Sequence, residues 1–107
     1  MAKSLNVEDI GYGPSLCVFL DDVPADDAVR AEGHEPNGYF WRGVAEFIRG
    51  DISRRLNFDP EGSMFVAYGD AALLEQLAAS LTPVFNDPAR AVEVIHAARA
   101  VGFEFDD

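Results

Sequence analysis

Five consecutive apolar residues, Met64–Tyr68, lie between Ser63 and Gly69. A run this short predicts a strand, and because both of its faces are apolar we expect it in the centre of a sheet. Segment 15–22 is a second near-continuous apolar run that ends in two aspartates, and it predicts another strand buried on both faces. The sequence therefore predicts a fold built around a β-sheet.

A turn sequence, Asp59–Ser63, joins segment 52–58 to this central strand. Pro60 and Gly62 occupy positions that suit a type I turn leading into a bulged hairpin. Apolar and polar residues alternate towards the end of segment 52–58, so we expect one face of that arm to be solvated. The closing residues 103–107 alternate apolar and acidic side chains, which is typical of a short edge strand.

Pro24, with Asp26 and Asp27 in the first turn, predicts a short helix over residues 25–31. Apolar residues at helical spacing predict three more, over residues 38 to about 50, 71 to about 83, and 88–101. Typical N-cap residues precede the last three helices, namely Asn37 (with Gly38 as the alternative), Asp70 and Asp87. The apolar stripes that we expect in the core are Phe40, Val44, Phe47 and Ile48, then Leu73, Leu74, Leu77, Ala78 and Leu81, and finally Ala91, Val94, Ile95, Ala98 and Val101.

The predicted fold class is α+β, with a small, mainly antiparallel sheet and helices packed on one face. Hydrophobic residues make up 49% of the chain, which is a folding composition rather than a disordered one. At 107 residues the chain allows one domain, so we expect residues 1–107 to form a single unit.

The charge of the chain limits its partners. The formal net charge is −11, from 19 acidic and 8 basic residues. Direct binding to nucleic-acid phosphates or to an anionic membrane needs clustered lysines and arginines, so both are disfavoured. No apolar stretch approaches the roughly 20 residues of a membrane span, and segment 1–13 has no apolar signal-peptide core. We therefore expect a soluble, cytoplasmic protein.

Few residues have a pattern that indicates catalysis. Gly11–Pro14 lacks the Lys and Ser/Thr of a phosphate loop, and Cys17 lies in an apolar run where we expect a buried small hydrophobe. His34 and the neighbouring carboxylates can be drawn as a metal or acid–base site, but a solvated acidic loop explains the same residues. We expect no catalytic residue, metal or cofactor, and keep a small metal-dependent hydrolase using His34 as an alternative.

Three consecutive aromatic residues, Tyr39, Phe40 and Trp41, begin the helix predicted from residue 38. Phe40 is expected in the core, and on a helix the side chains of Tyr39 and Trp41 cannot both share its direction. At least one of the two is therefore expected at the surface, where Tyr and Trp are typical anchors of protein interfaces. For Trp41 both a core position and an interface position stay open.

Three stretches of the sequence are distinctive, namely Asn37–Trp41, Phe58–Glu61 leading into Met64–Tyr68, and the closing segment 102–107. They resemble bacterial polymorphic-toxin immunity proteins, and more narrowly immunity protein family 51. The resemblance covers most of the chain from Leu16 onwards, although Pro36 stands where the family motif has Gly. It implies protection against a toxin made by the same cell, and it supplies no catalytic residues.

The resulting hypothesis is a non-enzymatic immunity protein that binds a cognate toxin domain and occludes its active site or substrate path. If the toxin is a nuclease, its phosphate-binding face is basic and attracts an acidic protein. The predicted partner-binding residues are Tyr39 and Trp41 as anchors and Asp26, Asp27, Glu32 and Glu35 as steering charges. A general acidic interaction module is a further alternative, and solubility alone also explains the charge. The oligomeric state stays open.

Overall fold

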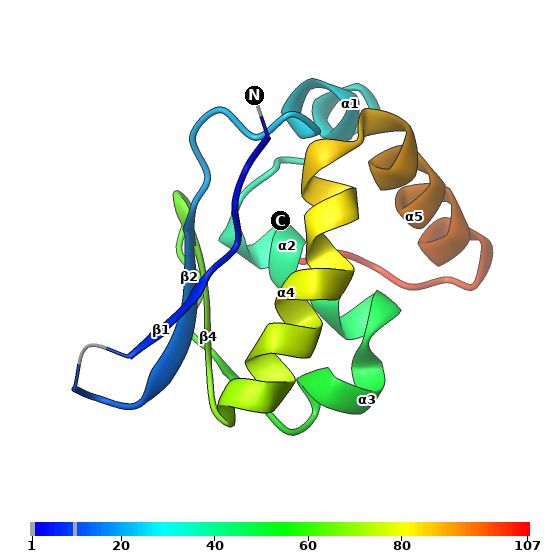
Figure 1. Ribbon diagram of the computed structural model, residues 1–107. Coiled ribbons are helices and arrows are strands. Elements are labelled where there is room, and N and C mark those ends of the chain that lie inside the picture. Colours follow the sequence, from blue (N-terminus) through cyan, green and yellow to red (C-terminus); the bar gives the residue numbers. More distant parts are fainter. Residues whose placement is uncertain (1, 10) are drawn as a thin grey trace.

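The structure, a computed structural model, describes residues 2–9 and 11–107 (Figure 1). These residues form one sheet with the strand order β1-β2-β4-β3, in which every neighbouring pair is antiparallel. The strands are β1 (Val7–Asp9), β2 (Pro14–Phe19), β3 (Asn57–Phe58) and β4 (Met64–Tyr68). The helices are α1 (Asp26–Ala31), α2 (Gly38–Ile48), α3 (Gly50–Ser53), α4 (Ala71–Asn86) and α5 (Pro88–Ala100). None of these helices is long and apolar enough to cross a membrane.

The helices lie on one side of the sheet, as predicted (Figure 1). Side chains alternate across a strand, so Leu16 and Val18 of β2 and Phe65 and Ala67 of β4 all point towards the helices and are buried. Strand β4 pairs with β2 on one side and β3 on the other, which confirms its central place. The predicted α+β class is therefore correct.

Strand β2 is buried on one face only, which corrects the prediction for segment 15–22. Cys17 and Phe19 alternate with its buried residues and are exposed, because no helix in the described part of the chain covers that side of the sheet. The expectation of a buried Cys17 is wrong for the same reason. An apolar sequence run reports the character of both faces of a strand but does not show which face the helices will cover.

The arm predicted over residues 52–58 is mostly not a strand. The chain instead forms α3, and only the two residues of β3 pair with β4. Ser53 explains the difference, because its buried hydroxyl donates to the carbonyl of Ala45 at 2.9 Å and fixes a helical turn directly after α2. This contact joins two helices and outweighs the local strand pattern.

The helix starts follow the predicted caps. The side-chain oxygen of Asn37 accepts from the Phe40 amide at 2.9 Å, so Asn37 and not Gly38 is the cap of α2. The carboxylates of Asp70 and Asp87 likewise accept from amides in the first turns of α4 and α5. Helix α4 continues past Pro83, whose ring is exposed to solvent.

The core lies between the sheet and the helices. Trp41 is fully buried and stacks on Phe85 at a centroid distance of 3.9 Å, which joins α2 to α4. Helix α5 packs against α1 and α4 through Ala91, Val94, Ile95 and Ala98. Val101 is exposed, contrary to the prediction, because α5 ends at Ala100 and Gly102 turns the chain with a φ of +74°.

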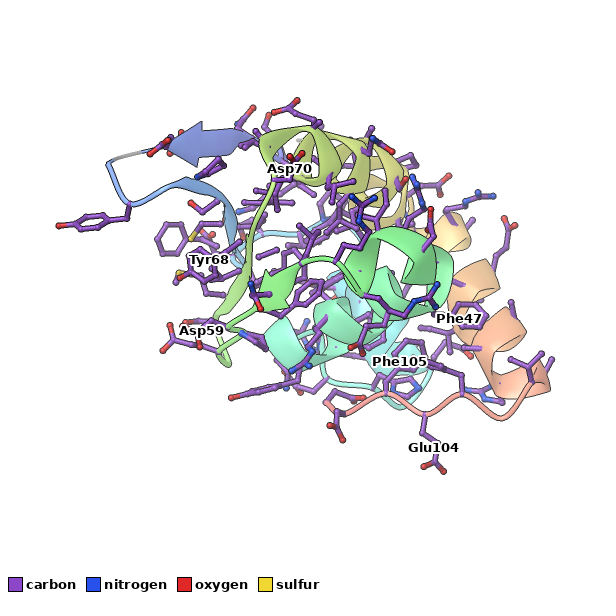
Figure 2. The ribbon with its side chains drawn as sticks, turned by 90° about the horizontal axis from the view of Figure 1, so that it is seen from below. Phe47, Asp59, Tyr68, Asp70, Glu104 and Phe105 are labelled. Atoms are coloured by element: carbon purple, nitrogen blue, oxygen red, sulfur yellow. The ribbon has the colours of Figure 1, made fainter. Side chains whose placement is uncertain are left out.

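The closing segment 103–107 is not an edge strand. It runs in an extended form along α2, and Figure 2 shows Phe105 directed towards the body of the protein while Glu104 points away from it. The ring of Phe105 packs on Phe40 and lies so close to Gly43 that a Cβ there would be 2.7 Å from it. Packing on a helix therefore replaces strand pairing for the alternating apolar residues.

Candidate partner-binding site

The two aromatic anchors predicted from the sequence have different positions. Tyr39 is exposed in the first turn of α2. Trp41 is fully buried, so the prediction that it contacts a partner is corrected and it belongs to the core. Helix α2 begins against the hairpin between β3 and β4, where the Gly38 amide donates to the carbonyl of Glu61 at 3.0 Å. Tyr39 therefore follows directly after this contact with the hairpin.

The predicted steering charges on and after α1 are partly engaged within the protein. The Glu32 carboxylate lies 2.7 Å from His96 Nε2 and 3.5 Å from Arg99 Nη1, so it connects the end of α1 to α5. Glu35 is exposed, and its backbone amide donates to the carboxylate of Asp107 at 2.7 Å. Among the described residues no hydrogen bond or ion pair engages the Glu35 carboxylate, whereas the charge of Glu32 is partly balanced.

Asp26 and Asp27 occupy the first turn of α1. Asp27 is exposed and lies 3.4 Å from Arg30. Asp26 is partly buried, and this burial raises the pKa of its carboxyl group above the ordinary value. Both residues line an acidic surface hollow of about 500 Å³ together with Asp21 and Asp22. Tyr39 lines a different hollow, so the structure does not gather the predicted residues into one site.

His34 holds the closing segment in place. Its Nδ1 lies 3.0 Å from the Asp107 carboxylate, and its ring packs against both Phe40 and Phe105 at centroid distances of 5.6 and 5.2 Å. Among the residues that the structure describes, no group of three or more His, Cys, Asp or Glu side chains is placed to hold a metal ion. These contacts give His34 a packing role between α2 and residues 103–107.

The side of the sheet away from the helices carries a row of apolar and aromatic side chains, which we call the outer face. The register places Phe19 opposite Met64, Cys17 opposite Val66, and Ser15 opposite Tyr68. Phe19 is 64% exposed and Tyr68 is 41% exposed, and Figure 2 shows Tyr68 pointing away from the helices. Part of this face forms an open hollow of about 440 Å³.

Residues 11–13 precede β2 and project beyond the sheet (Figure 1). The Asp9 carboxylate accepts hydrogen bonds from the amides of Gly11 at 2.9 Å and Gly13 at 3.2 Å. Both glycines have a positive φ, which a residue with a side chain rarely adopts. Between them Tyr12 is 94% exposed and lines the same hollow as Tyr68. Residues 11–13 therefore present an aromatic ring at the rim of the outer face.

Carboxylates flank this apolar surface. Segments 7–20 and 57–70, which contain all four described strands, have five acidic residues and no lysine or arginine. Glu8 pairs with Ser15 in the sheet, and Glu61 forms a bridge with Met64. Burial raises the pKa of the Cys17 thiol, and the negative charges of Glu8 and Glu61 raise it further. Both carboxylates are therefore close enough to act on the middle of the outer face.

Sequence reasoning missed the outer face because it assigned both faces of segment 15–22 to the core. A usable signal was present in the charges, since residues 7–20 and 57–70 lack basic residues while the rest of the chain carries eight. Strand β1 was also not predicted. Its sequence, Val-Glu-Asp, has no strand pattern, and its conformation comes from pairing with β2.

Together these features define a small α+β domain whose apolar, acid-flanked surface lies on an open sheet. The sequence model of a family described as Immunity protein 51 matches residues 7–100 of the chain. The protein therefore belongs to the Immunity protein 51 family, as its resemblance indicated, and an immunity function follows from that membership. Comparison with curated proteins and with solved structures found no match to the chain.

Proposed function

We propose that this protein protects its cell by binding a cognate toxin domain and occluding that domain's active site or substrate path, without catalytic turnover. The observation that carries the proposal is the match to the Immunity protein 51 family over residues 7–100. The surfaces described above support it, because they offer aromatic and charged side chains for contact with a protein. The proposal includes a cytoplasmic location, where the antagonist would meet a toxin made by the same cell.

The energetics of such a complex are ordinary for a domain of this size. Protection against a toxin requires roughly nanomolar affinity, which corresponds to about −12 kcal/mol. An interface of about 800 Å² on each partner is typical, and a few well-packed aromatic or arginine side chains supply most of the binding energy. The exposed aromatic residues of this protein are suited to supply that binding energy.

The net charge of −11 favours a toxin domain with a basic contact surface, such as that of a nuclease. We propose that Asp26, Asp27 and Glu35 add to the negative potential that attracts it. Glu32 contributes to the same potential from within its contacts with α5. Tyr39 is proposed as an additional contact residue, because it is exposed beside the β3–β4 hairpin.

The test is co-expression with the toxin domain encoded beside this protein's gene. We expect growth to be restored, and an inactivated form of the toxin domain to co-purify with this protein in a fixed ratio. In vitro, inhibition should reach completion at one equivalent of the protein for each toxin domain. Protection of a large excess of toxin by a small amount of this protein would indicate turnover and would contradict the proposal.

A further inference from the structure

We infer that the outer face is the docking surface for the toxin domain, and that the toxin meets it with an apolar patch surrounded by lysine or arginine side chains. This inference rests on the proposed function and specifies where and how binding occurs. It takes Tyr12, Phe19 and Tyr68 as the aromatic contacts and Glu8 and Glu61 as flanking charges.

The outer face is apolar although it is solvated. An antiparallel sheet with one face in water usually alternates apolar residues inside with polar residues outside. Here Ser15 is the one polar residue among the outward positions of β2 and β4; Cys17, Phe19 and Tyr68 are exposed, Met64 is half-buried and Val66 is buried. Contiguous exposed apolar surface of this kind marks sites of protein interaction.

The strands give the outer face a fixed backbone. Strand β4 is hydrogen-bonded on both sides, and β2 is held between β1 and β4. On either side of Tyr12, the amides of Gly11 and Gly13 donate to the Asp9 carboxylate. Binding therefore orders few additional groups, which lowers its entropic cost. The surface is formed before the partner arrives.

The charges of the outer face identify its occupant. Acidic residues are the only charged residues in the strand segments 7–20 and 57–70, so a basic surface complements the outer face. A second copy of this chain would bring two such acidic segments together with no basic residue from either to balance them. The charge distribution therefore favours a basic toxin domain over self-association.

Cys17 provides a direct test, because it is the only cysteine and lies in the middle of the outer face. The free protein and its complex with the inactivated toxin domain are treated with N-ethylmaleimide at one pH, and alkylation of Cys17 is followed by mass spectrometry. We expect the toxin domain to slow alkylation at least about tenfold. A complex that forms while Cys17 reacts at the free rate would overturn the docking surface and leave the proposed function standing.

Two further results would also overturn the inference. If no complex forms, the proposed function and the docking surface fail together. If the free protein sediments as a dimer with Cys17 already protected, a second copy occupies the outer face.

A pair of variants tests the contacts themselves. The double substitution Tyr12→Ala and Phe19→Ala should raise the Kd for the toxin domain at least about 30-fold, as expected for interface hot spots. Val101→Ala is the matched control, because Val101 is 72% exposed at the end of α5, outside the sheet. It should change the Kd by less than about threefold. An equal effect of both changes, or an effect of neither, would contradict the assignment.

Discussion

Among the glycines, Gly38 is the position at which an added side chain would clash most severely with its surroundings. It begins α2, and a Cβ at this position would overlap the backbone oxygens of Met64 and Glu61 in the adjoining hairpin. Backbone atoms cannot move aside as the end of a flexible side chain can. The close approach of helix and hairpin therefore depends on a residue without a side chain.

Gly38→Ala should consequently lower the free energy of unfolding by about 2 kcal/mol or more, as overpacked substitutions do. Gly50→Ala is the matched control, because it lies in α3 and the nearest atom to its added Cβ is the end of the Arg54 side chain at 3.8 Å. The control should be neutral or stabilising, since alanine favours helices. Urea denaturation of both variants measures the difference. Equal stabilities would show that helix and hairpin do not meet this closely.

Trp41 allows the core to be tested separately from binding. Trp41→Ala should cost about 3 to 5 kcal/mol of unfolding free energy, because it empties a fully buried site beside Phe85. Trp41→Phe keeps an aromatic ring and should cost less. The folded fraction of either variant should bind the toxin domain with unchanged affinity. A weaker affinity with unchanged stability would place Trp41 at the interface after all.

At the scale of elements, the closing segment 103–107 stabilises the fold without belonging to a regular element. Phe103 lies 5.2 Å from Phe47, and Phe105 packs on Phe40 and His34. These contacts cover the part of α2 that carries Phe40, Gly43 and Phe47. The segment therefore adds to the burial of α2.

Phe105→Ala should lower the free energy of unfolding by about 2 to 3 kcal/mol, less than the roughly 3 to 5 kcal/mol of a fully buried phenylalanine, because the ring is only partly buried. Glu104→Ala is the control from the same segment, and it should have almost no effect because its side chain points into solvent (Figure 2). Thermal denaturation followed by circular dichroism compares the two. A Phe105 variant as stable as the control would mean that the segment is detached from α2 in solution.

The elements differ in how well the sequence predicts them, and the difference has a physical cause. Helices α4 and α5 have local signals, because the caps Asp70 and Asp87 bond to amides two and three residues away. The turn of α3 depends on Ser53 bonding to Ala45, eight residues earlier, and β1 depends on pairing with β2. Features set by contacts between elements cannot be recognised from a local pattern.

At the scale of the whole molecule, charge and shape act together. The sequence carried a charge signal for the outer face, but it could not show that this face stays uncovered, since the face of β2 that becomes buried is decided by where α2 and α4 pack. The excess of negative charge was evident from the sequence. That residues 7–20 and 57–70 lack lysine and arginine identifies an acidic surface only once β1, β2 and β4 are known to lie in one sheet. The candidate site is therefore a product of tertiary structure.

The position of the charges can be tested apart from their number. Glu8→Lys with Glu61→Lys should slow association with the toxin domain about tenfold at low salt, because both residues flank the outer face. Glu75→Lys with Glu104→Lys changes the net charge equally at exposed positions outside the sheet. Stopped-flow measurement at two salt concentrations compares the pairs. Identical rates for both would mean that only net charge matters and would contradict docking on the outer face.

The alternation of side chains along β2 and β4 has a consequence for how such an antidote changes over generations. Leu16 and Val18 hold the fold together, whereas their neighbours Cys17 and Phe19 project to the opposite side. Under the docking proposed above, substitutions at these two outward positions of β2 change the contact with the toxin domain and leave the inward packing intact. A lineage could then follow a diverging toxin without losing the stability of its antidote.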